Sequence, residues 1–420
     1  MAREMKDSGV EWIGDIPNGW NITRNKFVMV KEKQICPIYK NQDVLSLTQK
    51  GVIVRDLDNP TGKMPTSFDG YQYIHKGNLL MCLFDIDVTP RCIGLIKDDG
   101  ITSPAYSQFI VNHGFANYYY YYYLMLDFSK ELLHLAKNLR YSLTEELLGF
   151  VPVPFPPLEE QKNISNILDK KCSEIDNLTA DIEKQISLLE DYKKSIITEA
   201  VTKGLNPNVE MKDSGIEWIG KIPKHWKISK LKYLIQVNNT KSSNNEYKYV
   251  GLENVIGWAG KLVDDTNMSE SEFVPESSSN KAKKGDVLFG KLRPYLGKVF
   301  ISEENIICST EFLIMRPVDI EGKYLKLLFL SRDLVDVIDR STYGTKMPRA
   351  NSSFILNQYI PIPNTQEQNE ISAFLDKKCS EIDSLISDKK EQLEKLTSYK
   401  QSMIYEYVTG KKEVPTQEIA

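Results

Sequence analysis

The sequence contains two copies of the same motifs, about 206 residues apart. Residues 5–28 (MKDSGVEWIGDIPNGWNITRNKFV) and 211–234 (MKDSGIEWIGKIPKHWKISKLKYL) are identical at 14 of 24 positions. Residues 160–178 (EQKNISNILDKKCSEIDNL) and 367–385 (EQNEISAFLDKKCSEIDSL) are identical at 14 of 19 positions, at nearly the same offset. Two matching segments in the same order indicate a tandem duplication of one large unit rather than a solenoid of short repeats.

Between these motifs the two halves differ strongly. Short apolar runs separated by Gly, Pro and Asn predict strands, and the apolar stretches 117–135 and 323–338 predict one amphipathic helix each. The expected fold is therefore mixed α/β, with a pseudo-twofold internal repeat. The expected segments are a first variable domain at 1–155, a first helix at 156–205, a second variable domain at 206–362, a second helix at 363–410 and a tail at 411–420.

A heptad pattern follows each variable domain. No Pro or Gly interrupts residues 159–203, and apolar residues recur every seven positions in the first copy and at the matching positions 375, 382, 396 and 403 of the second. About 40 residues in a helix give a rod of roughly 60 Å. Sustained heptads in two helices of one chain predict an antiparallel coiled coil. Its expected seam consists of Leu168, Ile175, Ile182, Leu189, Ile196, Leu375, Ile382, Leu396 and Met403.

Composition excludes several classes of protein. The 420 residues are 41% hydrophobic and 26% charged, which is typical of globular chains and too apolar for a disordered one. No apolar run approaches the roughly 18 residues of a membrane span, and no secretory signal begins the chain. The six cysteines show no zinc or CxxC spacing, which favours reduced thiols in a cytoplasmic protein without a membrane role.

Catalytic motifs are missing from the sequence. It contains no dinucleotide-binding GxGxxG, no phosphate-binding GxxxxGK[ST] and no HExxH zinc motif. The tetrapeptide (Asn/Asp)-Pro-Pro-aromatic of amino-methyltransferases is also absent. We therefore expect no catalytic residue, no metal site and no cofactor bound by this chain.

Several loops combine residue types that suit nucleic acid. The net charge is −4, yet residues 206–360 form a basic block, and local fields rather than net charge attract a polyanion. Lys and Arg contact phosphates and guanine, Asn and Gln contact adenine, and Tyr stacks on bases. The alternative interpretation is a set of solubilising loops. The candidate DNA-binding residues are Gln49, Lys50, Arg91, Arg140, Tyr141, Lys291, Arg293, Tyr295, Lys298, Lys346, Arg349 and Asn351.

A run of six tyrosines, residues 118–123, also suits base stacking. The run lies on a predicted helix, whose spacing directs about half of the rings into the core. We therefore favour a structural role for it.

The motif SGVEWIGDIP..W, repeated as SGIEWIGKIP..W, and the twice-repeated EQ..I...LDKKCSEID helix resemble the DNA-specificity subunit of type I restriction-modification systems. The resemblance covers essentially the whole chain. It implies that each variable domain is a target-recognition domain that reads one half of a bipartite site in double-stranded DNA, and that the helices act as a ruler between the domains. It also implies a non-catalytic subunit that recruits two adenine-N6 methyltransferase subunits and, through them, two restriction/translocase subunits. S-adenosylmethionine, ATP and Mg are then expected in those partners.

Two alternatives belong to other classes of protein. A fusion enzyme requires methyltransferase or nuclease motifs, which the sequence lacks. A coiled-coil adaptor that binds only proteins does not require two divergent domains with basic loops.

Overall fold

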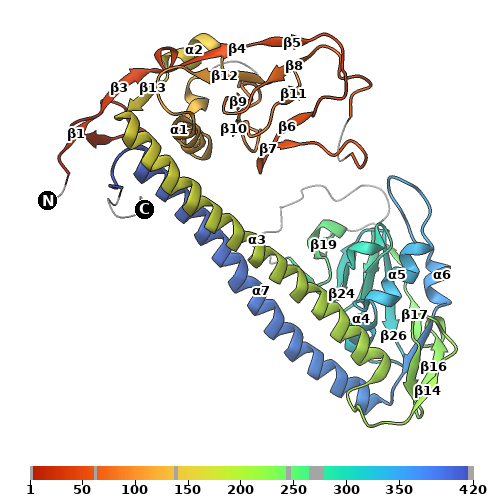
Figure 1. The fold of residues 1–420 in the computed structure, drawn as a ribbon. Coiled ribbons are helices and arrows are strands. Elements are labelled where there is room, and N and C mark those ends of the chain that lie inside the picture. Colours follow the sequence, from red (N-terminus) through yellow and green to blue (C-terminus); the bar gives the residue numbers. More distant parts are fainter. Residues whose placement is uncertain (1–2, 61–63, 137–140, 243–246, 264–278, 415–420) are drawn as a thin grey trace. The chain divides into compact units, whose positions relative to one another are not determined.

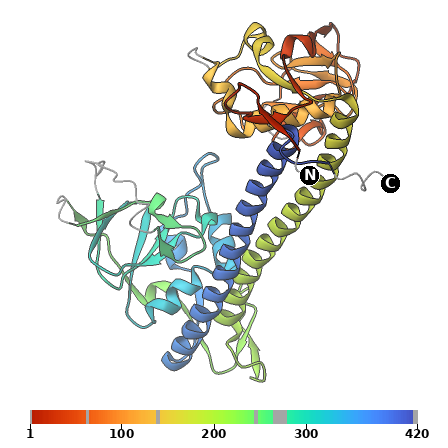
Figure 2. The same ribbon diagram turned by 90° about the vertical axis from the view of Figure 1, so that its left-hand side faces the viewer.

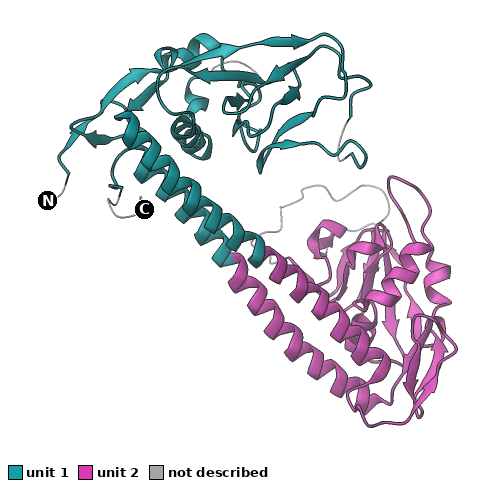
Figure 3. Ribbon diagram, viewed as in Figure 1, with its two compact units in different colours: residues 1–181, 391–420 teal, residues 182–390 magenta. Residues whose placement is uncertain are grey.

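The computed structural model describes residues 3–60, 64–136, 141–242, 247–263 and 279–414. The chain forms two compact units (Figure 3). Unit 1 comprises residues 1–181 and 391–420, and unit 2 comprises residues 182–390. None of the helices in the described part is both long and apolar enough to cross a membrane.

Unit 1 contains a four-stranded sheet of order β10-β9-β12-β4 and a three-stranded sheet of order β11-β8-β5. Three antiparallel strand pairs, β1-β2, β3-β13 and β6-β7, complete it. The strands are β1 (Met5–Asp7), β2 (Asp15–Pro17), β3 (Asn21–Arg24), β4 (Met29–Glu32), β5 (Gln34–Cys36), β6 (Leu45–Thr48), β7 (Gly51–Val54), β8 (Tyr71–Ile74), β9 (Leu79–Met81), β10 (Ile93–Leu95), β11 (Gly100–Thr102), β12 (Ser107–Val111) and β13 (Pro152–Phe155).

Unit 2 repeats this topology although the intervening sequence has diverged. Its four-stranded sheets have the orders β17-β26-β23-β24 and β18-β22-β25-β19, and β14-β15, β16-β27 and β20-β21 form pairs. The strands are β14 (Met211–Asp213), β15 (Lys221–Pro223), β16 (Lys227–Lys230), β17 (Ile235–Val237), β18 (Lys241–Ser242), β19 (Tyr249–Val250), β20 (Val255–Ile256), β21 (Lys261–Leu262), β22 (Ser279–Ala282), β23 (Val287–Gly290), β24 (Val299–Ile301), β25 (Ile306–Cys308), β26 (Phe312–Pro317) and β27 (Tyr359–Ile362).

The short helices differ from the sequence-based expectation in two ways. Helix α1 (Ala116–Ser129) is enclosed rather than amphipathic, because five of its six consecutive tyrosines are buried. The stretch expected to form one helix at 323–338 forms two, α4 (Gly322–Leu328) and α5 (Arg332–Arg340). The break occurs at Ser331, which has an extended backbone and whose hydroxyl donates to the Leu328 carbonyl. Helices α2 (Glu145–Phe150) and α6 (Ser352–Leu356) precede the last strand of each domain.

The two long helices are α3 (Leu158–Lys203) and α7 (Thr365–Val408), and each contributes to both units. Within each unit they lie side by side and antiparallel, as Figures 1 and 2 show from two directions. In unit 2, Lys193 Nζ lies 2.6 Å from Asp383 Oδ1 and Lys389 Nζ lies 2.5 Å from Gln185 Oε1. In unit 1, Lys400 Nζ lies 2.5 Å from Asp176 Oδ1. The predicted mixed α/β fold with antiparallel long helices is confirmed.

The predicted seam is only partly enclosed. Six of its residues are buried, namely Leu168, Ile175, Ile182, Leu375, Ile382 and Met403. Leu189, Ile196 and Leu396 are half-buried. The companion heptad row is buried at Ile164 and Ile371 but about half exposed at Leu178, Tyr192, Leu385 and Tyr399. The helices therefore pack on each other along one row and leave part of the second row in solvent.

Both domains are joined to the helices by equivalent contacts. The Trp20 indole donates to Glu160 at the start of α3, and the Trp226 indole donates to Glu367 at the start of α7. The Tyr118 hydroxyl donates to the Val408 carbonyl over 2.7 Å, at the end of α7.

In unit 2, the Tyr324 hydroxyl donates to the Val201 carbonyl over 3.0 Å, near the end of α3. Each domain thus rests on the start of one long helix and the end of the other.

Candidate nucleic-acid interface

The structure brings the two predicted basic loops of unit 2 together. Residues 291–298 connect β23 to β24, and residues 341–351 connect α5 to α6. The Arg293 amide donates to the Pro348 carbonyl over 2.7 Å, and the Ala350 amide donates to the Lys291 carbonyl over 2.9 Å. These backbone bonds make one two-loop surface from segments far apart in the sequence.

Glu311, which sequence reasoning did not single out, ties this surface to the sheet. Its carboxylate forms an ion pair with Arg349, and its backbone carbonyl accepts from the Lys291 amide over 2.9 Å. Its second carboxylate oxygen, Oε2, is buried and has no hydrogen-bond partner among the described residues. Nothing in the sequence indicates this pairing, because it depends on loops from different strands meeting.

The two half-buried lysines of the first loop differ in their surroundings. Burial lowers the pKa of Lys291, although the nearby Glu311 carboxylate opposes this effect. Burial also lowers the pKa of Lys298, whose ammonium donates to the Leu252 carbonyl over 2.6 Å. Lys298 therefore anchors a neighbouring turn, and its contact with a DNA phosphate stays a prediction.

The remaining candidates of unit 2 are exposed. Arg293, Tyr295, Lys346 and Asn351 all reach solvent, and Tyr295 is 46% exposed. Arg293 has a left-handed backbone with φ 51°, which turns the chain at the tip of the loop. The Asn351 side-chain oxygen accepts from the Ser353 amide over 2.8 Å, so Asn351 also caps helix α6.

Trp258 is a second residue missed by sequence reasoning. Its indole donates to the Tyr295 carbonyl over 3.1 Å, and Lys194 of α3 lies 5.1 Å from the centre of its ring. A Cβ at Gly297 would lie 2.6 Å from the Trp258 ring, so only glycine permits this approach. Trp258 thus holds the first loop beside the helix.

Among the described residues of unit 1, the candidates do not form a comparable two-loop surface. Gln49 and Lys50 form the exposed turn between β6 and β7. The Arg91 guanidinium donates to the Gln49 carbonyl over 2.8 Å, to the Ile93 carbonyl over 3.0 Å and to the Tyr120 hydroxyl. Arg91 therefore supports the turn that carries Gln49 and Lys50, and its contact with DNA stays a prediction.

The last two candidates of unit 1 lie at the end of a stretch outside the described residues and directly after it. Tyr141 is 46% exposed, and Arg140 lies outside the described residues.

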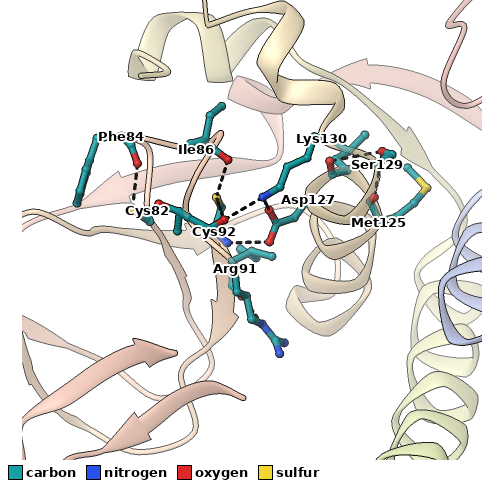
Figure 4. Close-up of polar contacts among 12 residues, drawn as sticks. Cys82, Phe84, Ile86, Arg91, Cys92, Met125, Asp127, Ser129 and Lys130 are labelled. Carbon is teal, nitrogen blue, oxygen red and sulfur yellow. Dashed lines mark hydrogen bonds and ion pairs between the residues drawn. The ribbon is translucent and has the colours of Figure 1, made fainter. Parts of the chain in front are cut away.

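Figure 4 shows how the chain on either side of Arg91 is fixed. The buried Asp127 carboxylate on α1 accepts from the Cys92 amide over 2.7 Å and pairs with Lys130 Nζ at 2.9 Å. Lys130 Nζ also donates to the Thr89 carbonyl over 2.9 Å. The cavity beside this network has a volume of about 20 Å³, which is room for one water rather than for a ligand.

These loops offer side chains that suit contacts with a nucleic acid. Exposed Arg, Lys and Tyr side chains can contact phosphates and base edges. Within the residues that the structure describes, no group of three or more His, Cys, Asp and Glu side chains could hold a metal ion.

The comparison with protein families decides the assignment. The model of the family described as "Type I restriction modification DNA specificity domain" matches residues 94–188 and 223–395. The chain belongs to this family. One matched stretch lies in each half of the repeat.

Named relatives agree with this family. The type I restriction enzyme MjaVIII specificity subunit of Methanocaldococcus jannaschii is 30% identical over 280 residues, covering 62% of this chain and 62% of the relative. The EcoDI specificity subunit of Escherichia coli is 20% identical over 280 residues, with the same shares. The similarity thus spans less than two thirds of these relatives.

A solved structure has the same fold as this chain. It is described as "Structural basis underlying complex assembly and conformational transition of the type I R-M system". The TM-score is 0.67 at 15% identity, covering 94% of this chain and 98% of the other.

Proposed function

We propose that this chain is the DNA-specificity subunit of a type I restriction-modification complex and reads a bipartite target in double-stranded DNA. The observation that carries the proposal is the two-loop surface of unit 2, with Arg293, Lys346 and Arg349. It lies on a domain whose fold occurs twice while its loop sequences differ. One scaffold with two different surfaces fits two different half-sites. Membership of the specificity family favours this function over a protein-only adaptor.

The proposed role is non-catalytic. Methylation and ATP-dependent cleavage belong to two adenine-N6 methyltransferase subunits and two restriction/translocase subunits, which would bind S-adenosylmethionine, ATP and Mg. The half-exposed row Leu178, Tyr192, Leu385 and Tyr399 supports recruitment of partners, because apolar side chains on long helices bind other helices. Its members occur in equivalent pairs, which suits two identical partners. The complex would work in the cytoplasm, where its DNA lies.

The decisive experiment combines binding and methylation. The chain would be purified with its methyltransferase subunit, and the methylome of cells that express both would be sequenced. We expect a co-purified complex and one bipartite N6-methyladenine motif. A chain that binds the methyltransferase but directs no sequence-specific methylation would instead support the adaptor function.

A further inference from the structure

Each unit carries an exposed group of two aromatic rings and two cations, in which both cations and one of the rings occupy equivalent positions of the repeat. Patch 1 consists of Arg24, Lys26, Phe27 and Phe150, and patch 2 consists of Lys230, Lys232, Tyr233 and Tyr359. The rings are 59%, 47%, 66% and 40% exposed, in that order. Exposed aromatic rings grouped with cations are typical of binding surfaces.

The cations lie against the rings in both patches. Arg24 Cζ is 5.2 Å and Lys26 Nζ is 5.1 Å from the centre of the Phe150 ring. Lys26 Nζ is also 5.2 Å from the Phe27 ring. These distances allow cation–π attraction.

Patch 2 repeats the arrangement with tyrosines. Lys230 Nζ is 5.2 Å from the Tyr359 ring, and Lys232 Nζ is 5.2 Å from the Tyr233 ring. Among the described residues, none of the four cations in the two patches forms an ion pair with a carboxylate. Their charges are thus available to a partner.

The repeat preserves the character of this surface but not its sequence. Arg24 corresponds to Lys230 and Phe27 to Tyr233, so a cation stands for a cation and an aromatic ring for an aromatic ring. The buried residue between the cations is Asn25 in one half and Leu231 in the other. At these three exposed positions the chemical character is kept while the buried residue beneath them changes, as expected of a surface that has the same role in both halves.

We propose that the two patches are equivalent docking sites for two copies of one protein partner, whose matching surface is acidic around an apolar hollow. The proposal rests on the proposed function, in which the partner is the methyltransferase subunit. Phe27 and Phe150 carry no polar group and gain free energy when an apolar surface covers them. A DNA backbone offers phosphates but no such surface, and stacking requires unpaired bases.

The test counts partner copies. The charge of patch 1 is reversed by Arg24→Glu with Lys26→Glu, and the charge of patch 2 by Lys230→Glu with Lys232→Glu. The matched control is Lys97→Glu with Lys284→Glu, because both lysines are exposed and lie outside the patches. Native mass spectrometry of each chain with its methyltransferase subunit, without DNA, should find two copies on the wild type and the control, one on each single-patch variant and none on the double variant.

Other outcomes overturn the inference in distinguishable ways. Two copies on every variant would show that the patches do not dock the partner. If, in addition, the double variant bound DNA with a shallower salt dependence, the patches would be backbone contacts instead. A wild-type chain that binds no methyltransferase would overturn the proposed function and this inference with it.

Discussion

At the scale of single residues, the position of a charge matters more than its type. Lys298 and Lys346 are both lysines of the two-loop surface in unit 2. The Lys298 ammonium is bound to the Leu252 carbonyl, whereas the Lys346 side chain is exposed. The first therefore contributes to the folded structure and the second is available for a phosphate.

This difference gives a paired prediction. Lys346→Ala should weaken binding to all duplexes, reduce the salt slope by about one unit and leave stability unchanged. Lys298→Ala should instead lower the free energy of unfolding by roughly 1–2 kcal/mol, because the Leu252 carbonyl loses a charged donor. Urea denaturation and binding at several salt concentrations separate the two effects. Equal effects of both variants on the salt slope would contradict the assigned roles.

The arginines of the same surface should read bases. Arg293→Ala or Arg349→Ala should relax one base position of the target at a cost of about 1–3 kcal/mol. The ion pair with Glu311 orients the Arg349 guanidinium, so Glu311→Gln should relax the same position as Arg349→Ala. Binding to duplexes substituted at each base is the measurement. A uniform loss at every position would indicate phosphate contacts instead.

At the scale of elements, the long helices show how far sequence reasoning reaches. Heptads are a local pattern, so residues 156–205 and 363–410 predict α3 and α7 to within two residues at each end. The meeting of residues 291–298 with 341–351 could not be predicted, because it depends on strand pairings between distant segments. The internal role of Arg91 was missed for the same reason: its partners Gln49 and Tyr120 lie far away in the sequence.

The helices also permit a test of the ruler. Four residues inserted near Leu188 should add about 6 Å and slightly more than one turn to α3. One base-pair step is about 3.4 Å, so the gap of the methylated motif should lengthen by one or two base pairs while both half-sites persist. Methylome sequencing provides the readout. A functional variant with an unchanged gap would contradict the ruler.

A second insertion, in α7, should compensate for the insertion in α3. The position that suits it differs from the one that the heptads indicate. Heptad matching places it near Lys395, yet Gln185 and Lys193 contact Lys389 and Asp383. The segment opposite Leu188 is thus close to Ser387. A second four-residue insertion there should restore stability that the first one removes through its heptad stutter. An insertion near Lys395 serves as the matched control and should restore none.

At the scale of the whole molecule, the duplication separates variable surfaces from a shared frame. The contacts that attach each domain to the helices come from the repeated motifs, as in Trp20 with Glu160 and Trp226 with Glu367. Replacing residues 30–150 by those of another family member should therefore change one half of the DNA target and leave the other half and the gap intact. Methylome sequencing again decides. A change in both half-sites would show that the domains do not read independently.

The contact between Tyr118 and Val408 has a consequence for how the molecule is made. A ribosome releases the first domain early, but Met403, Ile404, Tyr407 and Val408, which belong to its core, are synthesised only after all of unit 2. The part of α3 that belongs to unit 2 is synthesised before the rest of that unit, so unit 2 is complete once residue 390 has left the ribosome. The domain that is translated first is therefore the last to complete its core, and during synthesis it must wait with an uncovered apolar surface where the end of α7 will pack.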